Sequence, residues 1–117
     1  MKLIAGSRGT GKTRRLIQLA SKNEYLLACI NRDMSKYAWD MSKDLGIRII
    51  YPITHDQLLD GECLRGHTYA GILIDDVDRF LEKSLMHNVS IKAVSMSTDD
   101  LEVRIINPYG MNDLVEG

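Results

Sequence analysis

The sequence predicts an α/β protein with three layers, in which helices cover both sides of a mostly parallel sheet of five or six strands. Three observations support this class. Short apolar runs alternate with segments of helical periodicity, glycines and prolines separate the two, and 117 residues with 44% hydrophobic content suffice for one domain over residues 1–117. Strands that alternate with helices imply right-handed crossovers, which make neighbouring strands parallel.

In the first half of the chain, the apolar spacing predicts strands at residues 2–5, 25–30 and 47–51. A helix between the first two strands continues to Lys22. A second helix has Gly46 as its stop signal and carries apolar residues at i, i+3, i+4, i+7 and i+11, which would form one buried face. These residues are Met34, Tyr37, Ala38, Met41 and Leu45.

In the second half, Thr54 and Gln57 have the spacing of a capping box. They predict a short helix that runs to about Leu59 and ends at Gly61. The remaining predicted elements are a strand at residues 71–75, a helix at 77–87, a strand at 91–96, and a sixth strand with Val103, Ile105 and Ile106 before a polar tail.

Charge and composition exclude several classes of protein. With 15 Lys and Arg against 16 Asp and Glu, the net charge is -1, so nucleic acid would be bound by a local patch. No apolar run approaches the ~20 residues of a membrane helix, and the first residues are too few for a signal-peptide core. We therefore expect a soluble, cytoplasmic protein with no membrane partner.

Cys29 and Cys63 make no disulfide framework, and Cys63 with His67 lacks a second pair of metal ligands.

A phosphate-binding pattern, G-x-x-x-x-G-K-[ST], is matched at every fixed position by residues 6–13, between a predicted strand and a predicted helix. Its glycines let backbone N–H groups and the helix N-terminus face a triphosphate. Lys12 would reach the β- and γ-phosphates as a catalytic group, and the Thr13 hydroxyl would bind Mg²⁺. The alternative is a glycine-rich turn followed by Lys-Thr by chance. The expected nucleotide-binding residues are Gly6, Ser7, Arg8, Gly9, Thr10, Gly11, Lys12, Thr13 and Arg14.

Acidic residues follow the predicted strand at 71–75. Because ligands bind at the carboxyl edge of a parallel sheet, Asp75 is expected beside the phosphate loop, where it would hold Mg²⁺ through its water shell. Asp76 would orient or deprotonate the attacking water. The alternative is that Asp76 and Asp78 only favour the dipole of the following helix.

Small polar residues, 95–98, end the strand predicted at 91–96. In a strand next to the phosphate loop, Ser97 and Thr98 would face the γ-phosphate as sensor-like residues. Turn chemistry before Asp99 explains both residues equally well.

Together these motifs resemble P-loop nucleoside triphosphatases of the additional-strand class, which includes RecA-like helicase, packaging and AAA-type motors. Residues 6–13 look like the Walker A motif and residues 71–76 like Walker B. Residues 75–78 resemble a D-E-x-D box with one change, and residues 94–98 are similar in place to the Ser-Ala-Thr motif. Residues 30–32 are similar in place to the helicase motif that touches single-stranded DNA. The resemblance implies ATP or another nucleoside triphosphate, with Mg²⁺, as cofactors.

Two departures from this family affect the expected rate. Asp76 stands where the family has glutamate. Because misplacing a reacting group by about 1 Å can cost ~10²-fold in rate, we expect slow hydrolysis. An Asp76→Glu variant should hydrolyse ATP at an equal or higher rate. We expect no second RecA-like domain in this chain; the arginine of that domain, which would face the γ-phosphate, is worth ~10³–10⁵ in rate. Another copy or a protein partner would supply it. Arg65 and Arg79 are candidate donors, with a solvated surface as their alternative role.

Three interpretations remain. The leading one is an ATP-binding, Mg²⁺-dependent NTPase, slow alone and completed by self-association or a partner, in nucleic-acid transactions such as a helicase- or packaging-like motor of a virus or mobile element. The second is a nucleotide-gated binding module with little turnover. The third is a small-molecule kinase similar to thymidine kinases, although the clustered lid arginines and zinc-binding cysteines of those enzymes are missing.

A basic face is predicted on the second helix, formed by Arg32, Lys36, Trp39 and Lys43 at i, i+4, i+7 and i+11. These four residues lie opposite the predicted buried face. Aromatic stacking on bases, with flanking cations, suits single-stranded nucleic acid. Alternatively, Trp39 packs under the C-terminal segment or at a subunit contact.

Overall fold

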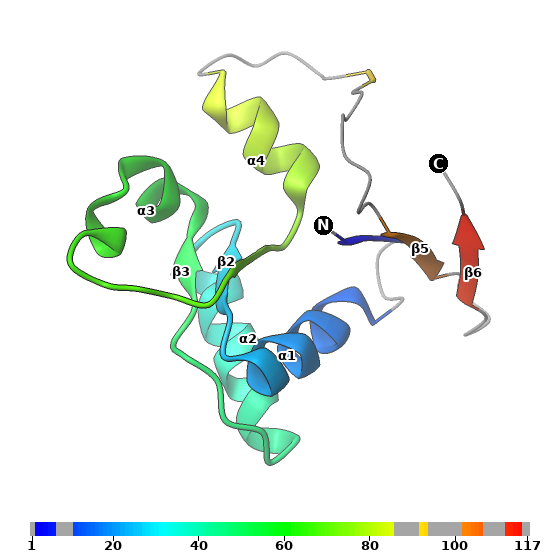
Figure 1. The fold of residues 1–117 in the computed structure, drawn as a ribbon, viewed down its shortest axis with the longest axis horizontal. Helices are drawn as coiled ribbons and strands as arrows, with labels where there is room; N and C mark the ends of the chain where they lie inside the picture. The colour runs from blue at the N-terminus through cyan, green and yellow to red at the C-terminus, as the bar shows by residue number, and fades with distance from the viewer. Residues whose placement is uncertain (1, 7–10, 86–91, 94–101, 107–111, 116–117) are drawn as a thin grey trace. The chain divides into compact units, whose positions relative to one another are not determined.

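The computed structural model of the chain describes residues 2–6, 11–85, 92–93, 102–106 and 112–115. The chain forms two compact units, which are Met1–Lys12 with Ala93–Gly117, and Thr13–Lys92. Each unit has its own three-stranded sheet (Figure 1).

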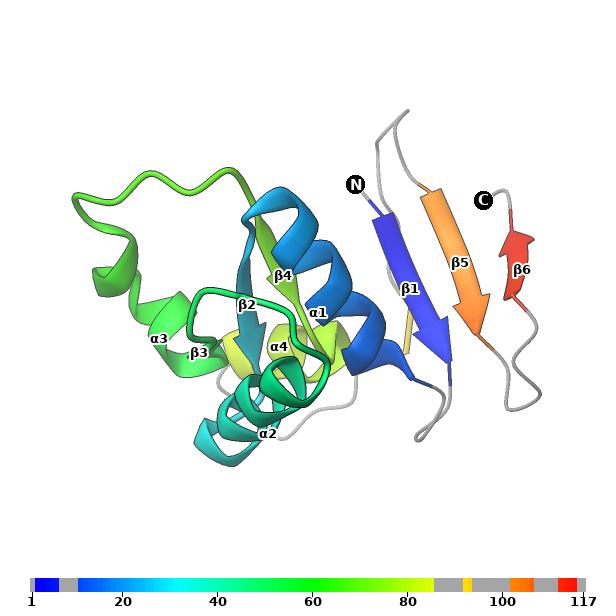
Figure 2. The ribbon, with the colours of Figure 1, turned by 90° about the horizontal axis from the view of Figure 1, so that it is seen from below.

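The sheet of the first unit consists of β1 (Lys2–Gly6), β5 (Glu102–Ile106) and β6 (Asn112–Val115), in that order. β1 and β5 are parallel, and β6 runs antiparallel to β5 at the edge (Figure 2). β1 and β5 confirm the first and sixth predicted strands. β6 lies in the segment that the sequence indicated as a polar tail. The strand was not predicted because an edge strand can carry charged and amide side chains and lack the apolar pattern of a buried strand.

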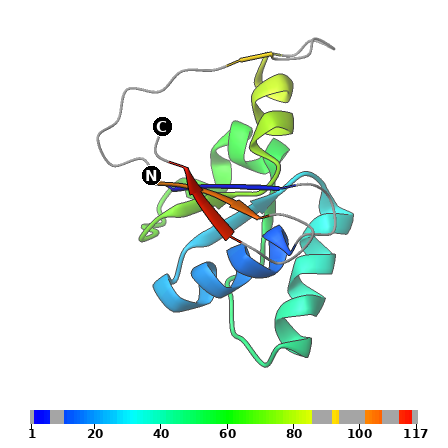
Figure 3. The ribbon, with the colours of Figure 1, turned by 90° about the vertical axis from the view of Figure 1, so that its right-hand side faces the viewer.

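In the second unit, together with the Lys12 that begins its first helix, the described residues form four α-helices, one 3₁₀ helix and three strands. In chain order these are α1 (Lys12–Asn23), β2 (Leu26–Cys29), α2 (Arg32–Asp44), β3 (Ile53–Thr54), α3 (His55–Asp60), η1 (Glu62–Leu64), β4 (Ile72–Ile74) and α4 (Val77–Ser84). The strands are parallel in the order β3-β2-β4. Helices α1 and α2 lie on one side of this sheet and α4 on the other (Figure 3).

The α/β class and the mostly parallel pairing are confirmed. The described strands form two three-stranded sheets, however, where one sheet of five or six strands was predicted. Within the strand predicted at 91–96, Lys92 and Ala93 belong to neither a strand nor a helix, and the other residues lie outside the described part of the chain.

Strand β2 is the centre of the second unit. All four of its residues are buried, at 1% exposure or less. A strand with helices on both faces has no solvent side, which explains why its sequence is a continuous apolar run without alternation. From α1, Leu16, Ile17 and Ala20 add to this core.

The third strand lies later in the chain than predicted. Residues 47–51 form no strand, and β3 begins at Ile53, beyond the proline that was expected to end it. In the predicted segment Ile49 is buried, whereas Ile50 and Tyr51 are 39% and 53% exposed. Proline is tolerated just before a strand, so Pro52 precedes the pairing with β2.

The buried face of α2 agrees with the prediction at Ala38 and differs from it elsewhere. Its buried residues are Ser35, Ala38 and Ser42, which we call the small-residue stripe, whereas Tyr37 is 52% exposed. Ser35 Oγ donates to the main-chain oxygen of Ile53 over 3.2 Å, and Ser42 Oγ donates to that of Trp39 over 2.6 Å. Because both hydroxyls are hydrogen-bonded, small polar residues can replace the expected large apolar ones.

The predicted ends of α3 and the predicted start of α4 at Val77 are confirmed, whereas the cap of α2 was not predicted. Asn31 caps α2 by accepting from the Met34 N–H over 2.9 Å. In α3, Thr54 and Gln57 form the complete capping box, and Gly61 ends the helix in the left-handed conformation at φ +74°. Helix α4 ends at Ser84, before the predicted residue 87, which lies outside the described residues.

Candidate functional site

The first turn of α1 meets the end of β4 through two predicted site residues. Thr13 Oγ1 donates to Asp75 Oδ2 over 3.0 Å. Thr13 belongs to the helix that follows the phosphate-loop pattern, and Asp75 directly follows the apolar strand. Asp75 is only 5% exposed. The two oxygens expected to bind Mg²⁺ are thus neighbours, although 62 residues separate them in the chain.

Main-chain contacts hold Asp75 on both sides. Its N–H donates to the main-chain oxygen of Ala28 in β2 over 2.9 Å. Its own main-chain oxygen lies 2.7 Å from Nε2 of His55, and its Oδ1 accepts from the Asp76 N–H over 3.1 Å. No pattern in the sequence marks His55 as a contact of this site.

Cys29, the last residue of β2, has a buried thiol near Asp75 and Asp76. Burial raises its pKa to about 12, and the carboxylate of Asp75 adds to the shift. The thiol is therefore neutral at physiological pH. A neutral thiol does not compete with Asp75 for a cation.

Asp76 has a left-handed backbone, with φ 55° and ψ 54°. Among non-glycine residues, Asp and Asn tolerate this conformation best. Asp76 is the N-cap residue of α4, yet its side chain makes no capping hydrogen bond to that helix. The carboxylate of Asp76 therefore does not cap α4, whereas the alternative in which Asp76 and Asp78 favour the helix dipole does not depend on such a bond.

Of the phosphate-loop pattern at residues 6–13, the structure describes the first residue and the last three. Gly6 is the last residue of β1, Gly11 has φ +86°, and Lys12 begins α1. Glycine adopts a φ of this sign without the steric cost that a side chain adds. Arg14 is exposed. Outside the described residues lie Ser7, Arg8, Gly9 and Thr10 of the pattern, and the sensor-like Ser97 and Thr98.

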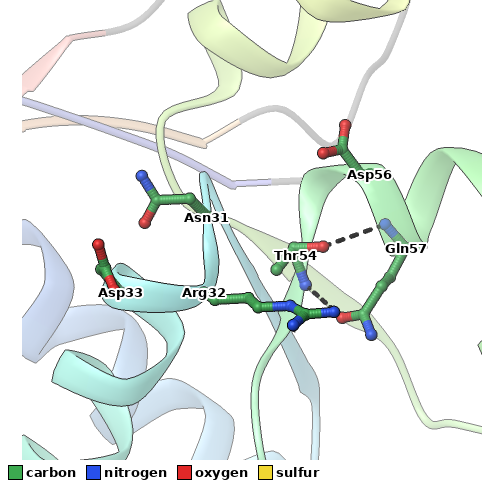
Figure 4. Close-up of a pocket in the computed structure, with 6 residues that line it drawn as sticks. All are labelled: Asn31, Arg32, Asp33, Thr54, Asp56 and Gln57. Carbon is green, nitrogen blue, oxygen red and sulfur yellow. Dashed lines mark hydrogen bonds between the residues drawn. The ribbon is translucent and has the colours of Figure 1, made fainter.

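A pocket of about 460 Å³ opens beyond the ends of β2 and β3, where α2 and α3 begin. The Arg32 side chain extends across it toward Gln57 (Figure 4). At its rim Asp56 forms an ion pair with Lys83 of α4 over 3.4 Å. The lining residues are Asn31, Arg32, Asp33, Thr54, Asp56 and Gln57.

On the basic face of α2, Trp39 and Lys43 contact each other, whereas Lys36 contacts Asp40. Trp39 packs against Tyr51, with 5.2 Å between ring centroids, and Lys43 Nζ lies 5.0 Å from the centroid of the Trp39 ring. Lys36 donates to Asp40 over 3.1 Å, which raises the pKa of Lys36. Trp39 thus has a partner within its own unit. Beside Trp39 and Lys43 lies a second cavity, of about 270 Å³.

The other predicted candidates lie on exposed loops and helices. Arg65 and Arg79 are both exposed. Cys63 Sγ lies 3.6 Å from the main-chain oxygen of Gln57. Among the described residues, no group of three or more His, Cys, Asp or Glu side chains is placed to hold a metal ion.

Comparisons of the chain with protein-family models, with curated proteins and with solved structures find no match. Within the described part of the chain, no helix combines the length and the apolar character needed to cross a membrane.

Proposed function

We propose that this protein binds a nucleoside triphosphate, ATP or another, together with Mg²⁺ and hydrolyses it slowly when alone. We further propose that its fold is that of a minimal P-loop NTPase domain. The observation that carries the proposal is the hydrogen bond from Thr13 Oγ1 to Asp75 Oδ2. A glycine-rich turn that resembled a phosphate loop by chance would not require its threonine to meet an aspartate at the end of a parallel strand.

The donor set fits Mg²⁺. A hydroxyl and a carboxylate are hard oxygen ligands, and Mg²⁺ in nucleotide sites is held by one or two protein ligands while phosphates and water complete its shell. The bound ion would neutralise negative charge on the phosphates. Thr13 would bind the ion through its hydroxyl oxygen while still donating its proton to Asp75, and Asp75 would hold the ion through its water shell.

The remaining roles follow from position. Gly11 brings the backbone close to the phosphates, and the N-terminus of α1 directs N–H groups at them. Lys12, at the first position of that helix, would bind the β- and γ-phosphates by charge-assisted hydrogen bonds. Asp76, whose side chain does not cap α4, would accept a proton from the attacking water or orient it.

A partner completes the site in this proposal. A second copy or another protein would add an arginine, and Arg65 and Arg79 are the candidates on this chain because both are exposed. The basic face of α2 would bind single-stranded nucleic acid. The tilted Trp39–Tyr51 pair beside Lys43 favours this role, since aromatic rings next to a cation suit bases and phosphates.

Titration of ATP with and without Mg²⁺ tests the proposal, with Lys12→Ala as the decisive variant. We expect that variant to lose binding, since each charge-assisted hydrogen bond is worth ~1.5–3 kcal/mol. Lys22→Ala is the matched control, because Lys22 is an exposed lysine in the last turn of the same helix. Equal ATP affinity for both variants would refute the phosphate-loop assignment.

Steady-state turnover separates this enzyme from the two alternatives. A nucleotide-gated module would bind Mg²⁺-ATP and release almost no phosphate, even with nucleic acid present. A kinase similar to thymidine kinases would consume ATP only when its small-molecule acceptor is added. An NTPase releases many equivalents of phosphate per molecule once its partner or nucleic acid is present.

A further inference from the structure

A buried histidine, His55, contacts the acidic strand end from α3. It is the first residue of that helix, and its side chain is 0% exposed. Its ring meets the ring of Phe80 in α4 edge to face, with 5.4 Å between centroids and 79° between planes. The imidazole therefore joins α3 to both the end of β4 and the helix that follows it.

One ring nitrogen of His55 is hydrogen-bonded and the other has no partner among the described residues. Nε2 lies 2.7 Å from the main-chain oxygen of Asp75, and because a carbonyl oxygen only accepts, Nε2 carries the proton and donates. Nδ1 is buried and unpaired in this part of the chain. A phenylalanine would fill similar space without burying an unpaired nitrogen, so packing alone does not account for histidine here.

The bond from His55 fixes the peptide group between Asp75 and Asp76. The Asp75 N–H is already bound to Ala28, so the bond to its carbonyl oxygen holds this residue from both sides. The same peptide group carries the Asp76 N–H, which donates to Asp75 Oδ1. Its orientation also sets the φ of Asp76, which is 55°. The directions of both carboxylates therefore depend on the peptide that His55 holds.

We propose that His55 is a positioning residue for the Mg²⁺-nucleotide site. It acts through Asp75 and Asp76, keeping the first aimed at Thr13 and the second in its left-handed conformation. This inference rests on the proposed function. Hydrogen-bond partners that orient metal-holding residues usually change metal affinity or activity ~10–100-fold when they are removed.

Three substitutions separate the hydrogen bond from the packing of the ring. His55→Gln places an amide nitrogen near the position of Nε2, whereas His55→Asn places one near that of Nδ1. His55→Phe keeps an aromatic ring against Phe80 and removes the donor. For Asn and Phe we expect the Mg²⁺ concentration for half-maximal ATP binding to rise ~10–100-fold, with kcat falling by a similar factor. Gln should remain close to wild type.

The experiment titrates MgCl₂ at fixed ATP and repeats the ATP titration in EDTA. In EDTA all three variants should bind ATP as wild type does, because His55 does not act on the phosphate loop. Circular dichroism and thermal melts establish that each variant is folded. Ser42→Ala is the control for stability: it also removes a buried side-chain bond to a main-chain oxygen, and it should leave the Mg²⁺ dependence unchanged.

Several results would overturn the positioning role. The first is a Phe variant with wild-type Mg²⁺ dependence, and the second is a Gln variant that needs as much Mg²⁺ as the Asn variant. The third is a Mg²⁺ dependence that changes in proportion to the melting temperature, which Ser42→Ala would then also show. Failure of the proposed function looks different, because wild type itself would bind no ATP in the presence of Mg²⁺. In that case both proposals are refuted.

Discussion

The hydroxyl of Thr13 and the carboxylate of Asp75 are joined by a hydrogen bond of 3.0 Å, which ties the start of α1 to the end of β4. A hydroxyl that donates to a largely buried carboxylate makes a charge-assisted bond, which is stronger than one between neutral groups. The two side chains therefore hold each other in place before any nucleotide is bound. A site organised in this way does not have to order these two groups when its ligand arrives.

Removing the Thr13 hydroxyl should weaken only the Mg²⁺-dependent part of nucleotide binding. Thr13→Val keeps the shape of the side chain and loses the oxygen, so we expect the Mg²⁺ requirement for ATP binding to rise about tenfold or more. A Mg²⁺ titration at fixed ATP measures this. Thr68→Val, at an exposed loop position, is the matched control. Identical Mg²⁺ dependence of both variants would mean that Thr13 serves only to anchor Asp75.

Asp75→Asn should lower Mg²⁺-dependent ATP binding and turnover, since the amide is a neutral and weaker ligand for a hard cation. Asp78→Asn is a suitable control, because Asp78 is an exposed acidic residue in the first turn of α4, two residues beyond the expected site. If the two variants lose activity equally, the acidic residues act through the helix dipole.

The left-handed backbone of Asp76 changes the expectation for glutamate at this position. Glutamate tolerates φ 55° less well than aspartate, so Asp76→Glu should destabilise the fold by about 1 kcal/mol and should not hydrolyse ATP faster than wild type. Asp76→Gly relieves the backbone and removes the acid. It should be stable and inactive. Thermal melts combined with phosphate release test both variants, and a Gly variant with normal turnover would exclude Asp76 from catalysis.

The buried thiol of Cys29 should be unreactive in the folded protein. Its pKa is raised to about 12 from 9.0, so folding keeps the thiol protonated over the range in which the unfolded chain ionises. The stabilisation from this group is therefore complete below about pH 9 and is lost as the pH rises toward 12. With a thiol reagent at pH 8, Cys63 should react first and Cys29 only on unfolding. Cys29→Ala should lessen the loss of stability at alkaline pH.

Single-stranded DNA should quench the fluorescence of Trp39, the only tryptophan, at low salt, and the affinity should fall steeply as salt is added. Tyr51, whose ring contacts that of Trp39, offers a second probe. Tyr51→Ala removes half of the aromatic pair and should weaken binding by ~1–3 kcal/mol if a base stacks there. Tyr37→Ala removes a similarly exposed tyrosine from the same helix as Trp39 and serves as the control. Unchanged fluorescence at low salt would assign the Trp39–Tyr51 contact to packing alone.

The sequence predicted those parts of the fold whose signal is local. The capping box of α3 and the continuous apolar run of β2 depend on residues close together in the chain, and both were confirmed. The position of β3 was predicted wrongly, because an apolar run does not indicate which of its residues will pair with β2. Likewise, periodicity favoured large apolar residues on the buried face of α2, whereas burial of serine depends on carbonyl oxygens that only the folded chain brings near.

For the candidate site, motif spacing predicted that Thr13 and Asp75 belong together, since each follows a recognisable strand or loop pattern. It did not predict His55. The role of that residue depends on a main-chain oxygen 20 residues away, and main-chain oxygens are the same at every position of a sequence. The left-handed backbone of Asp76 was also unpredicted, because aspartate adopts several conformations and only the turn into α4 selects this one.

The small-residue stripe of α2 connects the packing of the interior with the shape of the pocket at the start of this helix. Ser35, Ala38 and Ser42 let the helix lie close to the sheet, and the helix begins at the pocket with Asn31 and Arg32. A larger side chain in the stripe would push the helix outward and carry both pocket residues with it. Ala38→Val, a change in the interior of the protein, should therefore alter the volume of the pocket although Ala38 does not line it.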